Sequence, residues 1–128
     1  KRFKAASVGA GVTNLMSFTG TADIPGFLPD YFGGEFWDEG VAARFEGHSA
    51  MFQVGKVKTP TLIQHGEQDL RVPTAQGYEL YGALKRRQVP VKMVTYPRTP
   101  HGIQEPKLML DAMNRNLAWF DEWVMGRK

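Results

Sequence analysis

A short apolar run between a proline and a glycine constrains the fold of this chain more than any other feature. Residues 61–65 follow Pro60 and stop at Gly66, and Asp69 and Pro73 come soon afterwards. A run of this length with these boundaries is typical of a strand that is covered on both faces, as in a parallel sheet. Open α/β sheets carry binding and catalytic groups in the loops that follow such strands. We therefore expect Asp69 to lie where chemistry takes place.

Strand and helix patterns alternate around this run. Small and apolar residues at 3–8 and an alternating pattern at 91–96 each predict a strand. Thr74 is a favourable N-cap for a helix that reaches about Arg87, and a long amphipathic helix begins near Pro106. This order predicts an α/β fold with three parallel strands and flanking helices.

The region between the first two expected strands is less regular. Residues 12–20 fit either a short helix or a loop, and residues 21–43 predict a long irregular segment, with a short helix near 41–45. Irregular segments of this length are uncommon unless they build a site or a lid. Alternatively, the aromatic residues of this segment only anchor it to the body of the protein.

Composition argues against several classes of function. The chain has 128 residues, which is about one domain on the usual prior of about 100–200 residues. Its net charge of +3 is spread along the chain, so we expect no nucleic-acid partner. The absence of cysteine excludes disulfides, thiolate metal sites and cysteine nucleophiles, and fits a cytoplasmic location. The three histidines lack close acidic neighbours in metal-ligand spacing, and no apolar run approaches the ~18 residues of a membrane span. We expect no metal, no cofactor and no membrane contact.

Two ionisable residues follow consecutive expected strands, Asp69 after residues 61–65 and His101 after residues 91–96. Adjacent parallel strands lie about 4.8 Å apart, so the two loops can bring a carboxylate and an imidazole together. Such a carboxylate fixes the histidine tautomer and leaves Nε2 to take a proton from a nucleophile. In α/β-hydrolases the acid precedes the histidine in this way, after a serine on a Gly-x-Ser-x-Gly turn. The spacing alone also allows Asp69 only to cap a turn and His101 to have no catalytic part. His65 is expected to pack and hydrogen-bond beneath the loop.

Segments 9–14, 29–34, 58–73 and 96–102 resemble the C-terminal half of the catalytic domain of the prolyl oligopeptidase family of serine peptidases. The acylaminoacyl peptidase and dipeptidyl-peptidase-like branch is the most similar, and the resemblance covers essentially the whole chain. It implies that residues 1–128 form the C-terminal part of an α/β-hydrolase catalytic domain, a partial α/β-hydrolase fold. It also implies that Asp69 is the acid and His101 the base of a Ser-Asp-His triad.

The same resemblance implies a set of substrate-binding residues. Arg71 matches an arginine that binds a substrate carbonyl oxygen, and Val72 matches a position that lines the pocket for the residue before the scissile bond. Tyr31 and Phe32 match aromatic residues of that pocket more loosely. The substrate of the complete enzyme would be a short peptide.

The resemblance also implies that part of the catalytic machinery lies outside this chain. The serine turn should lie about a dozen residues before Lys1, and the oxyanion-hole donors and an N-terminal β-propeller should precede it. Loss of a triad serine costs about six orders of magnitude in turnover. We therefore expect this chain to be inactive by itself. The strand at 3–8 would have an unpaired edge, which predicts a homo-oligomer or association with the missing N-terminal half.

These observations favour a fragment of a serine peptidase. Two alternatives stay open, a fragment of an esterase or lipase on the same fold, and a non-catalytic interaction or self-assembly module. The first is distinguished by a preference for ester over amide substrates. The second is distinguished by the absence of a Gly-x-Ser-x-Gly sequence upstream in the gene.

Overall fold

The computed structural model describes residues 2–127, and its centre is a parallel sheet of three strands. The strands lie in the order β1 (Ala6–Gly9), β2 (Thr61–Gly66) and β3 (Val91–Tyr96). In β2, Thr61 lies opposite Ala6 of β1 and Val91 of β3. The predicted strands are confirmed, although the first begins at Ala6 rather than at residue 3.

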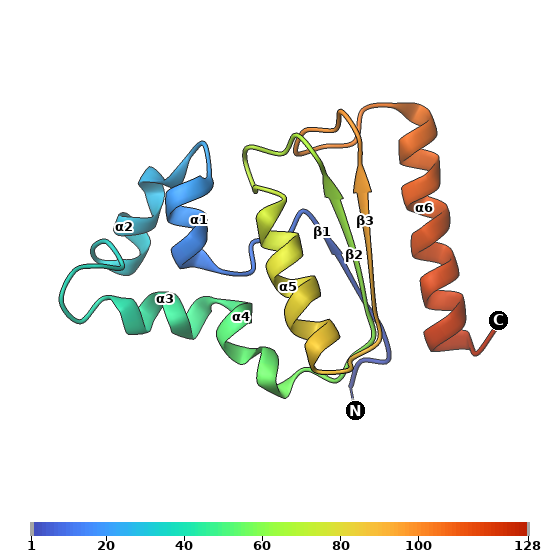
Figure 1. The fold of residues 1–128 in the computed structure, drawn as a ribbon, viewed down its shortest axis with the longest axis horizontal. Helices are drawn as coiled ribbons and strands as arrows, with labels where there is room; N and C mark the ends of the chain where they lie inside the picture. Colours follow the sequence, from blue (N-terminus) through green and yellow to red (C-terminus); the bar gives the residue numbers. More distant parts are fainter. Residues whose placement is uncertain (1, 128) are drawn as a thin grey trace.

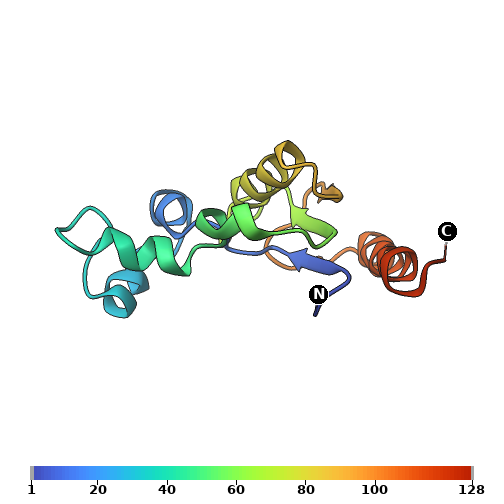
Figure 2. The ribbon, with the colours of Figure 1, turned by 90° about the horizontal axis from the view of Figure 1, so that it is seen from below.

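Helices cover both faces of the sheet. Helix α5 (Ala75–Arg86) packs on one face and α6 (Pro106–Phe120) lies on the other (Figures 1 and 2). All six residues of β2 are buried as a result, because this strand also has a neighbour on each edge. This double coverage explains why no residue of β2 faces solvent, and its polar residues Gln64 and His65 are buried with hydrogen bonds to Tyr96 and Val72.

The chain between β1 and β2 forms a lobe of short helices beside the sheet (Figure 1). Its helices are α1 (Leu15–Thr21), η1 (Pro25–Phe27), α2 (Leu28–Phe32), α3 (Ala42–His48), α4 (Ala50–Gln53) and η2 (Val54–Lys56). The prediction of an irregular segment over 21–43 is therefore wrong for η1 and α2, while the short helix near 41–45 is confirmed as α3. Helices of one or two turns are too short to leave a 3.6-residue repeat in the sequence.

Residues 12–20 contain a helix rather than a loop, and the side chain of Asn14 caps its N-terminus. Asn14 Oδ1 accepts hydrogen bonds from the backbone N–H groups of Met16 at 3.2 Å and Ser17 at 3.5 Å. The backbone N–H groups of Thr13 and Asn14 both donate to the buried Gln76 Oε1, at 3.0 and 2.8 Å. These bonds tie the start of the lobe to α5.

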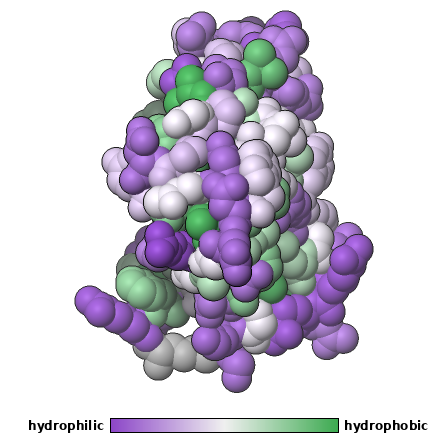
Figure 3. Space-filling view, turned by 90° about the vertical axis from the view of Figure 1, so that its left-hand side faces the viewer, coloured by the Kyte–Doolittle hydropathy of each residue, from purple (hydrophilic) through white to green (hydrophobic). Residues whose placement is uncertain are grey.

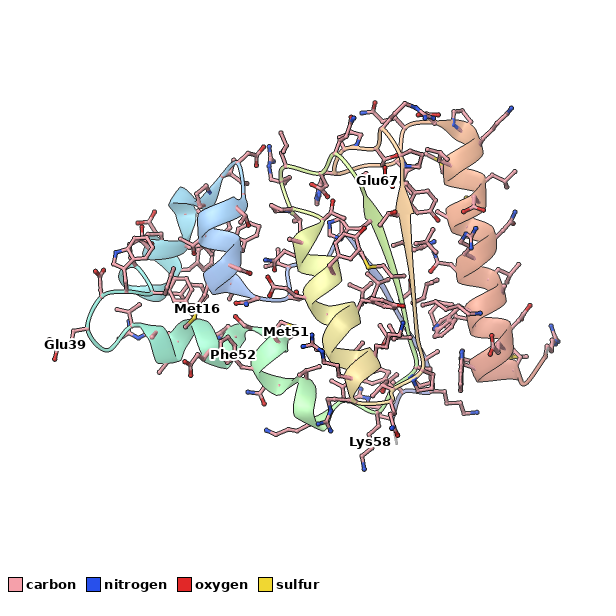
Figure 4. All side chains as sticks on the ribbon, viewed as in Figure 1. Met16, Glu39, Met51, Phe52, Lys58 and Glu67 are labelled. Carbon is pink, nitrogen blue, oxygen red and sulfur yellow. The ribbon has the colours of Figure 1, made fainter. Side chains whose placement is uncertain are left out.

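The described residues contain two hydrophobic cores. The first lies in the lobe and takes in Phe18, Leu28 and Phe45, together with Val72 from the loop after β2. The second lies between the sheet and α5 and contains Ile63, Leu80, Leu84 and Val89. Met16 packs against the first core and Met51 against the second (Figure 4). Because Val72 belongs to the first core, the loop that carries Asp69 is anchored in the lobe.

Thr74 precedes α5, as predicted, but its side chain does not cap the helix. Its hydroxyl donates to the carbonyl oxygen of Gly66 at 2.6 Å, and no side chain caps the N-terminus of α5. The hydroxyl thus closes the loop between β2 and α5. The prediction of a capping role is wrong because this nearby carbonyl competes for the donor.

The C-terminal helix continues from α6 into a π-helical turn over Asp121–Met125. Trp119 is buried against the sheet, and its ring lies 5.7 Å from that of Trp123. The opposite end of the molecule, where the lobe lies, presents small hydrophobic groups set among hydrophilic side chains (Figure 3). Within residues 2–127, no helix is long and apolar enough to cross a membrane.

Candidate active site

The loops after β2 and β3 meet at the carboxyl ends of the strands, where Glu67 lies in Figure 4. Asp69 follows β2 by three residues, and His101 follows β3 by five. His101 Nδ1 lies 3.0 Å from Asp69 Oδ2, so the structure brings the two predicted residues together.

Backbone contacts fix how closely the two loops approach. The N–H of Glu67 donates to the carbonyl oxygen of Tyr96 at 2.9 Å, and that of Gln68 donates to the carbonyl oxygen of Thr99 at 3.0 Å. A Cβ atom at Gly66 would overlap with the carbonyl oxygens of Thr99 and Pro100. Only glycine allows this approach, and the approach is what places His101 beside Asp69.

Asp69 uses its two carboxylate oxygens for different contacts. Oδ1 accepts a hydrogen bond from the N–H of Val72 at 2.9 Å and closes a turn, while Oδ2 faces His101. The same carboxylate therefore closes a turn and contacts His101. The Asp69 side chain is fully buried, whereas that of His101 is 52% exposed.

This arrangement can orient a histidine for proton transfer. An Nδ1–H tautomer of His101 donates to the buried carboxylate, and Nε2 makes no hydrogen bond within residues 2–127. A half-exposed imidazole with one nitrogen held and the other free is suited to accept a proton from a neighbouring hydroxyl.

A hollow of about 400 Å³ lies beside this pair. It is lined by Gly9, Ala10, Gln64, His65, Gly66, Tyr96, Thr99, Pro100, His101, Ile103, Ala112 and Asn116. No serine lines it, and the three serine hydroxyls of the chain are bonded elsewhere: Ser7 to Asn116, Ser17 to Glu79 and Ser49 to the carbonyl oxygen of Phe45. The buried Thr99 hydroxyl donates to the carbonyl oxygen of Pro97. Within residues 2–127, no serine hydroxyl and no threonine hydroxyl of the lining is therefore free beside His101.

Arg71 lies two residues after Asp69 and forms an ion pair with Asp23. Its Nε donates to Asp23 Oδ1 at 2.8 Å, and a terminal nitrogen lies 3.4 Å from Oδ2. The hydrogen bond to Asp23, and then its charge, raise the pKa of Arg71 above its ordinary value, with a smaller contribution from the charge of Asp69. The guanidinium stays charged and about half exposed beside the loop of Asp69.

The three other predicted substrate-binding residues lie in or against the lobe. The side chain of Val72 is buried in the first core. Tyr31 is 80% exposed on α2, with its ring edge-on to that of Phe27 at 5.9 Å. Phe32 packs on Phe45, with ring centroids 4.5 Å apart. None of the three lines the hollow beside His101 within the described residues.

Two contributors to the site went unrecognised in the sequence. Asp23, two residues after the end of α1, forms an ion pair with Arg71. The backbone N–H of Asp23 also donates to the carbonyl oxygen of Leu70 at 2.9 Å. His65, expected only to pack and hydrogen-bond, also lies 3.6 Å from Asp69 Oδ2. The spacing of four residues between His65 and Asp69 was the one available signal for the second contact.

Comparisons with known proteins show the family to which this chain is related. The model of the prolyl oligopeptidase family matches residues 1–127. The acylamino-acid-releasing enzyme of Mus musculus is 36% identical over 113 residues, which cover 84% of this chain and 15% of the mouse protein. That of Arabidopsis thaliana is 33% identical over 128 residues, which cover 95% of this chain and 17% of the plant protein. The chain thus spans less than a fifth of the length of these relatives.

The fold is shared with solved peptidases. The acylaminoacyl peptidase of Pyrococcus horikoshii superimposes with a TM-score of 0.85 at 20% identity, over 98% of this chain and 21% of that one. The three parallel strands and their flanking helices are accordingly part of an α/β-hydrolase fold. With a family model that matches nearly every residue and relatives above 30% identity, this chain belongs to the prolyl oligopeptidase family.

Proposed function

We propose that this chain supplies the base and the orienting acid of a Ser-Asp-His triad to a serine peptidase that cleaves short peptides. The observation that carries the proposal is the 3.0 Å contact between His101 Nδ1 and the buried carboxylate of Asp69, at the carboxyl ends of two parallel strands. Family membership supports peptide-bond hydrolysis as the reaction.

In the proposed reaction, His101 Nε2 takes the proton of a serine hydroxyl as the serine oxygen attacks the peptide carbonyl carbon. The histidine then gives this proton to the leaving amine, and an acyl-serine remains. His101 next removes a proton from a water molecule that hydrolyses the acyl-serine. Asp69 stays ionised throughout and stabilises the imidazolium. The serine comes from a segment outside residues 1–128, either of the same protein or of a partner chain.

We propose that Arg71 binds a substrate carbonyl oxygen and that Val72, Tyr31 and Phe32 contribute to the pocket of the residue before the scissile bond. Arg71 and Tyr31 are exposed enough to meet a ligand, whereas Val72 would act as a buried wall behind the pocket. The names of the relatives, acylamino-acid-releasing enzyme and acylaminoacyl peptidase, support an N-acylated peptide as the substrate class. The cysteine-free sequence supports a cytoplasmic location.

The test uses the complete open reading frame that encodes residues 1–128. We expect its product to contain a Gly-x-Ser-x-Gly sequence upstream, to react with a fluorophosphonate probe and to hydrolyse N-acylated peptides faster than the matching esters. Residues 1–128 alone should not react with the probe. Faster hydrolysis of esters would favour the esterase alternative, and a reading frame without the serine turn would favour the non-catalytic module.

Substitutions in the complete product test the two residues. His101→Ala should lower kcat by about six orders of magnitude, and Asp69→Asn by about four. His48→Ala is the matched control for kcat, because the His48 ring bonds to the carbonyl oxygen of Arg44 and packs on Phe32, without contact to Asp69 or His101. Full activity of the His101→Ala product would overturn the proposal.

A further inference from the structure

His65 is a buried imidazole that the proposed proton transfer does not itself use. It lies near the end of β2, four residues before Asp69, and is 1% exposed. A titratable side chain in the core is uncommon unless it makes specific polar contacts.

The contacts of His65 converge on the turn that holds Asp69. His65 Nε2 lies 2.7 Å from the carbonyl oxygen of Val72 and 3.6 Å from Asp69 Oδ2. The N–H of Val72 donates to Asp69 Oδ1 at 2.9 Å. Both backbone polar groups of Val72 are thus held, one by Asp69 and one by His65, and the turn is closed from two sides.

The surroundings of the other ring nitrogen assign the tautomer. His65 Nδ1 is buried and has no hydrogen-bond partner within residues 2–127. It faces Gly77 of α5, where an added Cβ atom would lie 2.8 Å from Nδ1, 3.0 Å from the Met93 side chain and 3.5 Å from the Ile63 side chain. A proton on Nδ1 would be buried without an acceptor, whereas a proton on Nε2 meets the Val72 carbonyl. The Nε2–H tautomer follows, and His65 acts as a donor.

We propose that His65 is a positioning residue that holds the Asp69 carboxylate in place through Val72, so that Oδ2 stays directed at His101 Nδ1. The inference rests on the proposed function only because that function gives the Asp69–His101 pair its catalytic role. The contacts themselves involve no serine and no substrate. Without the Nε2–H donor, the Val72 carbonyl loses the one side-chain partner that it has within residues 2–127, and the turn can rotate Asp69 away from His101.

The chain offers a matched pair of substitutions. A glutamine amide reaches the place of the imidazole Nε2 and can donate to Val72, whereas an asparagine amide reaches only the place of Nδ1, which faces Gly77. His65→Gln should therefore preserve the turn, and His65→Asn and His65→Leu should not. Leu84→Ala, in the second core, serves as a control for a loss of stability that leaves the turn intact.

The readout is the tautomer of His101, measured by ¹⁵N-resolved NMR on residues 1–128 at neutral pH. We expect the Nδ1–H form of His101 to predominate in the native chain, in His65→Gln and in Leu84→Ala. The ratio of Nδ1–H to Nε2–H forms should fall at least threefold in His65→Asn and His65→Leu. A native ratio in folded His65→Leu, or equal ratios in His65→Gln and His65→Asn, would overturn the inference.

The comparison of His65→Gln with His65→Asn tests the positioning role of His65 even if His65→Leu does not fold. Failure of this inference and failure of the proposed function are distinguishable. A native chain in which His101 is not mainly in the Nδ1–H form counts against the Asp69–His101 pair itself. A native chain with that form and no effect of His65 substitutions counts against the positioning role alone.

Discussion

Gly66 is a single residue on which the geometry of the site depends. Gly66→Ala would put a Cβ atom against the backbone carbonyl oxygens of Thr99 and Pro100, which cannot rotate away as a side chain would. We expect the loop that carries His101 to move and the free energy of unfolding to fall by about 1–3 kcal/mol. Denaturant unfolding of residues 1–128 and the His101 NMR signals measure the two effects.

Gly102→Ala is the matched control for this substitution. Gly102 adjoins His101 in the same loop, yet a Cβ atom there meets nothing within 4 Å. If Gly102→Ala costs as much stability as Gly66→Ala, the close approach at Gly66 is not the cause.

The ion pair between Asp23 and Arg71 allows a prediction about substrate binding. In the complete enzyme, Asp23→Asn should raise KM several-fold and leave kcat nearly unchanged. The substitution removes the charge that holds the Arg71 guanidinium, which is proposed to bind the substrate, and it changes no contact of His101. The stability of the protein should change little, since both side chains are about half exposed and water and salt screen their attraction. Steady-state kinetics with an N-acylated peptide provide the measurement.

Glu105→Gln supplies the comparison for Asp23→Asn. Glu105 forms a similar exposed ion pair with Arg98, in the loop that carries His101, and neither side chain bonds to Arg71. An equal rise in KM for both variants would mean that Asp23 has no specific role at Arg71.

At the scale of elements, a polar network joins α6 to the sheet. Gln64 Nε2 of β2 donates to the Tyr96 hydroxyl at 2.9 Å, and Asn116 Nδ2 of α6 donates to Gln64 Oε1 at 2.7 Å. The Tyr96 hydroxyl donates to Asp111 Oδ2 at 3.2 Å. Because several of these groups are buried, the position of α6 depends on all of them being bonded.

Tyr96 makes this network sensitive to alkaline pH. Burial raises the pKa of Tyr96 above its ordinary value, and the charge of Asp111 adds to the effect. A group with a raised folded-state pKa contributes stability in full below its unfolded pKa, and that contribution is lost as the pH rises through the folded pKa. The native chain should therefore lose stability above about pH 10, and Tyr96→Phe should lose less.

Denaturant midpoints measured from pH 8 upward check this expectation. Tyr78→Phe is the control, because Tyr78 is exposed on α5. Identical alkaline slopes in the native chain and in Tyr96→Phe would contradict the assigned cause.

The sequence predicted those elements whose pattern is long enough to repeat. The burial of β2 and the lengths of α5 and α6 left clear patterns, whereas η1 and α2 are too short to do so. The meeting of Asp69 with His101 was predictable because parallel strands end at one edge of a sheet. The pairing of Asp23 with Arg71 was not, because the path of the lobe brings together residues 48 positions apart. Thr74 shows a related limit, since the carbonyl of Gly66, at the end of β2, accepts the hydroxyl proton of a residue that local rules assign to the helix cap.

At the scale of the whole molecule, one side of the described chain combines an unpaired strand edge with exposed apolar side chains. Within residues 2–127, β1 pairs only with β2, so its other edge is free. An apolar stripe along one flank of α6 and the turn after it is exposed, and consists of Leu110, Met113, Leu117, Phe120 and Val124. The opposite flank contacts β3 through Asp111 and Glu122, which places the stripe on the flank toward β1. The free edge and the apolar stripe therefore lie on the same side.

We expect this side to drive association of residues 1–128, because a free strand edge and a neighbouring apolar helix flank both favour pairing with another chain. Sedimentation or light scattering should give a mass above that of the monomer, and the double substitution Met113→Lys and Leu117→Lys should lower it. Leu70→Lys is the control, since Leu70 is 70% exposed but lies in the loop after β2, outside the stripe. If another segment of the complete protein covers this side, the double substitution should lower stability there rather than change the mass. A stable monomer of the native chain at high concentration would contradict the expectation.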